Sequence, residues 1–362
     1  MQRMLSRFEP PVDVDPQVLS AVIIARNEET SIGRCVESIL RAMKSFDGGE
    51  VVLVDARSTD RTVRIASGYP IRIVRLRKGV RATAALGRVI GQRLTNSRYL
   101  LFADGDSEVN HEWVTAAVAF MDGQPDVGGV GGKLREVYYS DGVRVGELDD
   151  FFAMGNVVEV AYQLGGNALY RRAALERVGS FNPAVVSFEE AEVAARLRQA
   201  GFRLMRLPMV AAVHHTTPRG GVSEAWRRLC SGLQTGFGQV LRLTVGTPLF
   251  WPHARQLNRY LLCLGFLIAG IAAGVATLFV RDPVYVLSWI AFAAVLTTLL
   301  IVRGRNMSQT VGILADWLFA APAIAWGFVR RPAGPQMVAV ERLIERVGDA
   351  SDAATLAGTL GH

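Results

Sequence analysis

Four short apolar runs alternate with amphipathic segments in the first 109 residues, and this alternation limits the fold more than any other feature of the chain. The runs are Leu19 to Ala25, Val51 to Val54, Ile71 to Leu76 and Leu100 to Ala103. The segments between them place apolar residues at helical spacing. This β-α-β-α-β-α-β pattern predicts an α/β domain with a parallel sheet that is covered by helices on both faces.

Acidic and amide residues follow three of these predicted strands. Asn27 and Glu28 come after the first strand, Asp55 ends the second, and Asp104 and Asp106 follow the fourth. Ligands of open parallel sheets bind outside the carboxyl ends of the strands. Taken alone, the Asp-x-Asp pair is also typical of an acidic turn. Three acidic strand ends on one edge indicate a site, where a Mg²⁺ or Mn²⁺ ion shared with phosphates would neutralise the carboxylates.

The C-terminal third contains most of the apolar excess of a chain that is 50% hydrophobic. We expect membrane segments at 259–280, 283–302 and 311–329, because the runs Tyr260 to Val280 and Pro283 to Val302 lack charge and are long enough to cross a bilayer. Asp316 and Pro322 interrupt the third run, which either spans the membrane or re-enters it.

Positive charge predicts the orientation of these segments. Arg303 and Arg305 lie between the second and third runs, so that loop is expected in the cytoplasm. Arg330 and Arg331 follow the third run and slightly favour re-entry. The N-terminus lacks an apolar signal core, and three scattered cysteines indicate a reducing compartment. We therefore expect a multi-pass protein of the inner membrane with its N-terminal domain in the cytoplasm.

Several function classes are disfavoured. The net charge of +7 suits phosphorylated substrates and anionic lipids, whereas no nucleic-acid-binding motif accompanies it. The glycine-rich stretch VGGVGGKL lacks the residues of a phosphate-binding Walker loop, since Val127 and Leu134 stand where glycine and Ser or Thr are needed. It is predicted to be a strand with close backbone approach. The first strand is not followed by the glycine pattern of a dinucleotide-binding domain.

Five motifs occur in an order that resembles a known family. They are ARNEE, DARSTDRT, DGDSEV, GGNALYRR and EEAEVAARLRQAG. The stretch from about residue 19 to residue 245 is similar to inverting glycosyltransferases of family 2, which have the Rossmann-like GT-A fold. The basic helix and membrane segments that follow resemble bacterial membrane-anchored exopolysaccharide glycosyltransferases of the succinoglycan type.

The resemblance implies a division of the chain. Its parts are a lead-in of residues 1–17, a GT-A domain of residues 18–220, a basic amphipathic membrane-interface segment of residues 221–258, membrane segments within residues 259–331, and a tail of residues 332–362 that is expected to be poorly ordered.

The resemblance also implies roles for the residues at the strand ends. Asn27 and Glu28 would border the nucleotide, and Asp55 would accept the N3–H of uracil. Asp104 would face the ribose and the metal ion, and Asp106 would bind the metal ion, either Mn²⁺ or Mg²⁺.

Later motifs supply the remaining site residues. Glu190 stands where the family has an aspartate as general base, and it would take the proton of the acceptor hydroxyl. Gly166 and Asn167 would approach the donor sugar. His214 would complete the metal shell, or else be part of an ordinary strand end. Arg219 would bind the donor diphosphate, or else contact the membrane surface.

These expectations define a function and its alternatives. We expect a metal-dependent inverting transferase that moves a sugar from a UDP-sugar to a lipid-linked saccharide or polysaccharide, with membrane lipids as a further partner. A polyprenyl-phosphate glycosyltransferase ranks second and a processive polymer synthase third. A catalytically inactive membrane scaffold and a nucleotidyltransferase are the alternatives from other classes.

Overall fold

The computed structural model describes residues 17–46, 49–140, 142–160, 162–218, 221–303, 307–330 and 343–347. The chain forms two compact units. We call the first the sheet unit; it comprises residues 1–184, 189–218 and 333–362. We call the second the helical unit; it comprises residues 185–188 and 219–332.

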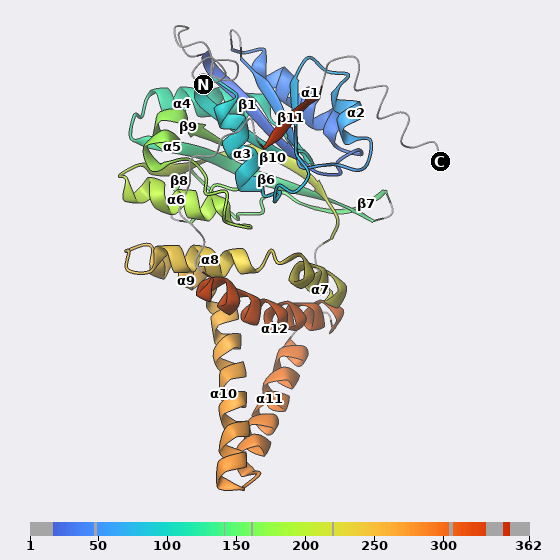
Figure 1. Ribbon diagram of the computed structural model, residues 1–362, viewed down its shortest axis with the longest axis vertical. Helices are drawn as coiled ribbons and strands as arrows, with labels where there is room; N and C mark the ends of the chain where they lie inside the picture. The colour runs from blue at the N-terminus through green and yellow to red at the C-terminus, as the bar shows by residue number, and fades with distance from the viewer. Residues whose placement is uncertain are drawn as a thin grey trace. The chain divides into compact units, whose positions relative to one another are not determined.

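The sheet unit is built on one mixed sheet (Figure 1). Its strands are β1 (Gln17–Ala25), β2 (Val51–Asp55), β3 (Arg72–Leu76), β4 (Ser97–Asp104), β5 (Ser107–Val109), β6 (Val127–Ser140), β7 (Val143–Leu148), β8 (Val158–Glu159), β9 (Ala168–Arg171), β10 (Arg203–Thr216) and β11 (Ile344–Val347). The main order is β11-β3-β2-β1-β4-β9-β6-β10-β5. The four predicted strands β1 to β4 pair in parallel, which confirms the α/β prediction.

Among the described residues, six helices belong to the sheet unit. These six are α1 (Ile32–Met43), α2 (Thr62–Ala66), α3 (Ala84–Arg93), α4 (His111–Asp122), α5 (Arg172–Val178) and α6 (Glu189–Gln199). The next helix along the chain, α7 (Val222–Ser231), follows β10 in sequence and belongs to the helical unit.

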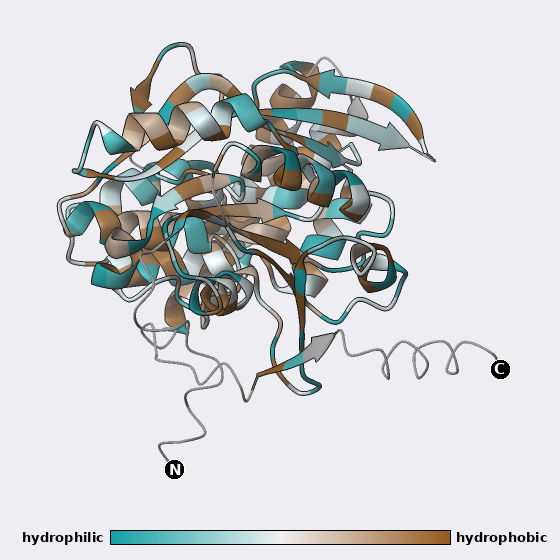
Figure 2. Ribbon diagram, turned by 90° about the horizontal axis from the view of Figure 1, so that it is seen from above, coloured by the Kyte–Doolittle hydropathy of each residue, from teal (hydrophilic) through white to brown (hydrophobic). Residues whose placement is uncertain are grey.

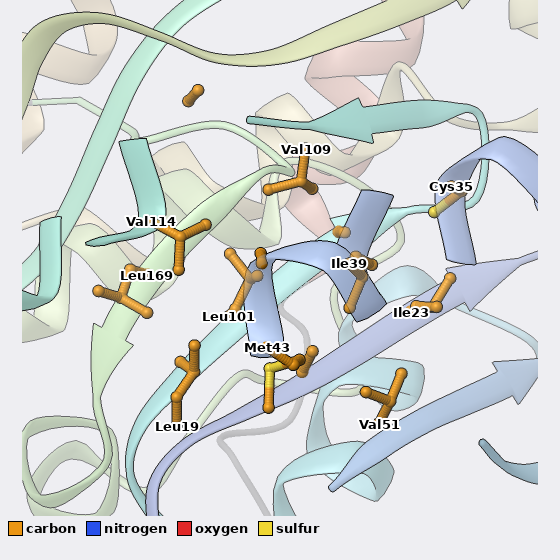
Figure 3. Packing of buried hydrophobic residues seen from close by; sticks show 14 of the residues in the cluster. Leu19, Ile23, Cys35, Ile39, Met43, Val51, Leu101, Val109, Val114 and Leu169 are labelled. Atoms are coloured by element: carbon orange, nitrogen blue, oxygen red, sulfur yellow. The ribbon is translucent and has the colours of Figure 1, made fainter. Parts of the chain in front are cut away.

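Alternating residues of each central strand face two separate cores. Leu19 and Ile23 of β1 and Leu101 of β4 pack on one face against α1 and α4 (Figure 3). Val22 and Phe102 point to the other face, against α3, α5 and α6. Both faces are buried because successive strand residues point to opposite sides. In Figure 2 the central strands are accordingly brown, whereas the helices carry teal residues as well.

The glycine-rich stretch is the first part of β6, as predicted. A Cβ on Gly129 would lie 2.8 Å from the side chain of Leu164, and one on Gly132 would lie 2.7 Å from the backbone of Met209. Both contacts are too close for a side chain, so these glycines permit the close packing of β6.

The start of α3 and the tail show where individual contacts set the fold. α3 begins at Ala84, because Thr83 adopts an extended backbone and its hydroxyl accepts the Leu86 N–H. The tail was expected to be poorly ordered, yet β11 lies within it and pairs antiparallel with β3. The apolar pattern of β11 is short, and the strand with which it pairs lies more than 260 residues away in the sequence.

The helical unit consists of amphipathic and apolar helices. After α7 come α8 (Thr235–Thr244), α9 (Phe250–Gln256), α10 (Asn258–Val280), α11 (Val284–Arg303) and α12 (Met307–Val329). The last three are long and apolar enough to cross a membrane. α10 and α11 form a hairpin (Figure 1), in which Phe266 stacks on Trp289 with ring centroids 4.8 Å apart.

Candidate active site

The carboxyl ends of β1, β2 and β4 meet at one edge of the sheet. Ala25 is in register with Asp55, and Ile24 with Asp104. Asn27, just past β1, has a positive φ of 59° and is held by the loop after β2: its N–H donates to Ser58 Oγ and its Oδ1 accepts the Thr59 N–H. Parallel pairing therefore brings together three strand ends that are distant in sequence.

Asp55 is closed off within this edge. Its side chain has no exposed surface, and both carboxylate oxygens accept the Ser58 N–H at 3.1 Å. Arg75 Nε lies 3.1 Å from Oδ2. A carboxylate oxygen can accept more than one hydrogen bond. Because the side chain has no exposed surface, however, a further donor can reach these oxygens only after the Ser58 loop moves.

Asp104 lies against a small-residue loop. A Cβ on Gly166 would overlap the Asp104 carboxylate, so a side chain there would displace that carboxylate. The neighbouring Asn167 is nearly buried, and its Nδ2 donates to Ser107 Oγ at 3.0 Å. The structure thus places Gly166 and Asn167 directly beside the Asp-x-Asp segment.

Three adjacent strands align Asp106, His214 and Glu136. His214 on β10 is in register with Ser107 on β5 and with Glu136 on β6. Its Nε2 lies 2.8 Å from Asp106 Oδ2, and its Nδ1 lies 3.4 Å from Glu136 Oε1. Glu136 is only 1% exposed, and its other oxygen accepts the Tyr138 hydroxyl at 2.6 Å. The imidazole is therefore held between two carboxylates.

Arg88 connects the Asp-x-Asp segment to the first turn of α6. Its side chain is 1% exposed. Nη2 lies 3.3 Å from Asp104 Oδ1 and 3.1 Å from Glu190 Oε1, and Nη1 bonds to Glu189. Since one nitrogen contacts both Asp104 and Glu190, those two carboxylates border the same small volume. Arg88 was not among the predicted site residues. The sequence marks it only as a single charged residue in the otherwise apolar stretch from Ala84 to Ile90.

Burial raises the pKa of three carboxyl groups at this site, Asp104, Glu189 and Glu28. Burial and the nearby charge of Glu190 raise the pKa of Glu189 to about 7, although the Arg88 cation opposes the shift. Burial and the charge of Asp106 raise the pKa of Glu28 to about 7. Perturbed carboxyl groups of this kind are typical of functional sites.

The remaining basic residues differ in their surroundings. Lys78 and Arg81, in the loop after β3, are exposed to solvent. His215 Nε2 lies 2.8 Å from Glu108 Oε1. Arg219 lies outside the described residues.

The candidate metal ligands can be compared with the coordination that a divalent ion requires. Within the described part of the chain, no group of three His, Cys, Asp or Glu side chains is arranged to hold a metal ion alone. Mg²⁺ sites commonly use one or two protein ligands and complete the shell with substrate phosphate and water. Asp106 supplies a carboxylate of that kind, and in the tautomer that donates Nδ1–H to Glu136, His214 Nε2 beside Asp106 Oδ2 would be a second ligand atom.

Known proteins resemble this chain in sequence and in fold. Residues 20–179 match the family described as Glycosyl transferase family 2. The glycosyltransferase AglE of Haloferax volcanii is 24% identical over 220 residues, which are 59% of this chain and 72% of AglE.

A solved structure shares the fold. The mannosyltransferase PcManGT from Pyrobaculum calidifontis, solved with GDP-Man and Mn²⁺, has a TM-score of 0.55 and 19% identity over 91% of this chain and 93% of its own. TarS 1–349 of S. aureus, solved with UDP, has a TM-score of 0.47 and 21% identity over 62% of this chain. This chain covers 64% of that TarS fragment. Residues 20–179 are thus similar to glycosyl transferase family 2, and the chain has the GT-A fold, followed by three helices long and apolar enough to cross a membrane.

Proposed function

We propose that this protein transfers a sugar from a UDP-sugar to a hydroxyl of a lipid-linked saccharide or polysaccharide, with inversion at the anomeric carbon, in the synthesis of a cell-surface polymer. The observation that carries the proposal is the position of Arg88 Nη2 between Asp104 and Glu190. It puts the Asp-x-Asp segment and a carboxylate from α6 around one volume. A donor diphosphate on one side and an acceptor hydroxyl on the other need such an arrangement.

Glu190 is the general base in this proposal. The acceptor oxygen attacks the anomeric carbon, the bond from that carbon to the diphosphate oxygen breaks, and the hydroxyl proton passes to Glu190. The first turn of α6 favours negative charge through its free N–H groups. Arg88 orients the Glu190 carboxylate by the 3.1 Å contact.

Asp104, Gly166 and Asn167 form the donor-sugar side. Gly166 allows the backbone to approach Asp104 closely, and Asn167 is oriented by Ser107. Asp106 and His214 would hold the divalent ion, Mn²⁺ or Mg²⁺, which when bound neutralises charge on the leaving diphosphate.

Asn27, Glu28 and Asp55 form the nucleotide side. Uracil offers an N3–H donor that cytosine lacks, and a carboxylate is a strong acceptor for it. Because Asp55 is closed by Ser58 in this structure, the proposal includes movement of the loop after β2 when the donor binds.

The apolar helices supply the location. A membrane-anchored enzyme with its sheet unit in the cytoplasm meets a lipid-linked acceptor at high effective concentration. α10 and α11, with 23 and 20 residues, have the length that a bilayer core of about 30 Å requires.

A turnover assay tests the proposal. Purified full-length protein with Mn²⁺, a panel of UDP- and GDP-sugars and a lipid extract should release UDP and give a lipid product of increased mass. Glu190→Ala should lower kcat by about 10² to 10⁴-fold, as expected for loss of a general base. Glu176→Ala, at an exposed position of α5, is the matched control.

The outcomes separate the alternatives. If the wild type releases no nucleotide from any donor, the protein is a scaffold and the proposal fails. If Glu190→Ala keeps full activity, the assignment of the base is wrong. A product in which the sugar is bonded directly to polyprenyl phosphate identifies the second-ranked activity instead.

A further inference from the structure

The connections between the two units limit the number of membrane crossings. The chain leaves the sheet unit after Pro218 and rejoins it at Ala333. Beyond that point β11 pairs with β3, so both connections end in one folded sheet. A folded sheet lies on one side of a bilayer, and the chain between residues 219 and 332 must therefore cross an even number of times. Three helices qualify for crossing by length and composition, so at least one of them does not cross.

Contacts of Asp316 identify α12 as that helix. Its carboxylate accepts hydrogen bonds from Gln234 Nε2 at 3.1 Å and from the Tyr260 hydroxyl at 2.8 Å, and Arg228 Nη1 lies 3.9 Å away. Arg228 belongs to α7, Gln234 precedes α8, and Tyr260 lies in the first turn of α10. The middle of α12 therefore lies beside the N-terminal turn of α10 and near the amphipathic helices α7 and α8.

Glycine contacts extend this packing along most of α12. Gly312 meets the backbone of Gly221 at the start of α7, and Gly327 meets the backbone of Thr235 at the start of α8. A helix that crossed the bilayer would place its two ends about 30 Å apart in depth. Here both ends of α12 lie against α7 and α8, and α12 runs across the α10–α11 hairpin (Figure 1).

The two faces of α12 differ in side-chain size. The inner face of α12 is rich in small residues. Of the most apolar 18 residues of this helix, one third (33%) are buried, against 0% for the corresponding residues of α10 and α11. The outer face exposes large apolar side chains, namely Val311, Leu318, Trp326 and Val329. Trp226 of α7 and Trp251 of α9 are exposed as well. Tryptophan is enriched at membrane–water interfaces, and a helix with one such face lies in the interfacial plane.

We propose that only α10 and α11 cross the bilayer, and that α12 lies in the interfacial plane with α7 and α8, its outer face against lipid. The bilayer is the occupant of that face because the face is continuous with a hairpin whose apolar residues are exposed and bilayer-length. Asp316 is then satisfied at the interface, where its partners are amphipathic, rather than in the hydrocarbon core. This inference concerns topology and does not depend on the donor, the acceptor or activity.

Cysteine labelling tests the number of crossings. Arg281→Cys, Arg303→Cys and Arg330→Cys are introduced singly into full-length protein that carries Cys230→Ser and Cys263→Ser. Cys35 stays, because burial raises the pKa of its thiol and shields it from reagent. Sealed vesicles of one orientation are treated with a membrane-impermeant maleimide before and after permeabilisation. Positions 303 and 330 should label from the same side and position 281 from the opposite side. Labelling of 330 together with 281 overturns the proposal.

Depth measurement separates an in-plane helix from a re-entrant one. Spin labels at Leu318→Cys and Val329→Cys are compared with one at Ile271→Cys within α10, by their collision with oxygen and with a water-soluble nickel complex. An in-plane α12 gives similar shallow depths at 318 and 329 and a deep position at 271. If 318 is as deep as 271, α12 re-enters the bilayer and the proposal is wrong. Free water access at 318 and 329 also overturns it. Thermal unfolding of each variant confirms that it is folded.

Discussion

Arg88 Nη2 lies 3.1 Å from Glu190 Oε1, which links α3 to the first turn of α6 across 102 residues of sequence. The same guanidinium contacts Glu189 and Asp104 and stacks near the ring of Phe181, 5.5 Å from its centroid. Three carboxylates thus share one buried cation. Glu189, 5% exposed, pairs with Arg88 from inside the protein, whereas the side chains of Glu190 and Asp104 are 16% and 41% exposed.

Removal of Arg88 should destabilise the sheet unit strongly. Arg88→Met leaves the buried Glu189 without a cation, and loss of one partner of a buried ion pair costs about 3–5 kcal/mol. The free energy of unfolding in denaturant measures this loss. Arg41→Met, at an exposed position of α1, is the matched control and should change stability by less than about 0.5 kcal/mol. Adding Glu189→Leu to Arg88→Met should recover part of the loss. Equal effects of the two arginine variants would contradict the buried network.

Glu136 should control metal affinity without touching the metal ion. Glu136→Gln weakens the contact that orients the His214 imidazole, and such outer partners typically change metal affinity by about 10–100-fold. Calorimetric titration with Mn²⁺ in the absence of donor measures the effect. His214→Ala should reduce affinity at least as much, whereas Glu147→Gln, at an exposed position of β7, should not. Unchanged Mn²⁺ affinity in both the Glu136 and His214 variants would place the metal elsewhere.

Gly166→Ala should weaken donor binding and leave the fold intact. The added Cβ overlaps the Asp104 carboxylate, so Asp104 must rotate away from its position beside Arg88. We expect the Kd for UDP-sugar to rise by about tenfold, equivalent to about 1.4 kcal/mol. Gly155→Ala is the control, because a Cβ there meets nothing within 4 Å. If the Gly166 variant binds donor normally, the loop does not form part of the donor pocket.

The pKa of Glu28 predicts a pH-dependent stability in metal-free protein. A folded-state pKa of about 7, raised from 4.5, means that the folded chain keeps a proton that the unfolded chain has lost. The stability contribution is fully present below pH 4.5 and is lost as pH rises toward 7. Glu28→Gln retains an acceptor for the Ser31 hydroxyl and removes the titration.

The Glu28 effect is read from unfolding at two pH values. With EDTA present, Glu28→Gln should be more stable than wild type by about 1–2 kcal/mol at pH 8, a value reduced for partial exposure, and by much less at pH 5. Glu37→Gln, on the exposed face of α1, is the control. A Glu28 difference that is the same at both pH values would mean that its carboxyl group titrates normally.

The sequence by itself determined the order of the elements and the edge of the sheet where the site lies. Apolar runs of strand length and helical spacing report burial over neighbouring residues, and this local information is sufficient for β1 to β4 and for α10 and α11. Because parallel strands end at a common edge, Asp55 and Asp104 were correctly expected together. The close approach in β6 was readable from its glycines.

The tertiary structure alone decided which partners those residues have. Arg88 meets Glu190, and Glu136 orients His214, each through contact between segments that are distant in the chain. β11 joins β3, and that pairing is what makes the number of crossings even and α12 an in-plane helix in our proposal. Periodicity encodes which side of an element is buried, but it carries no information on what lies opposite. That information arises only when the whole chain packs.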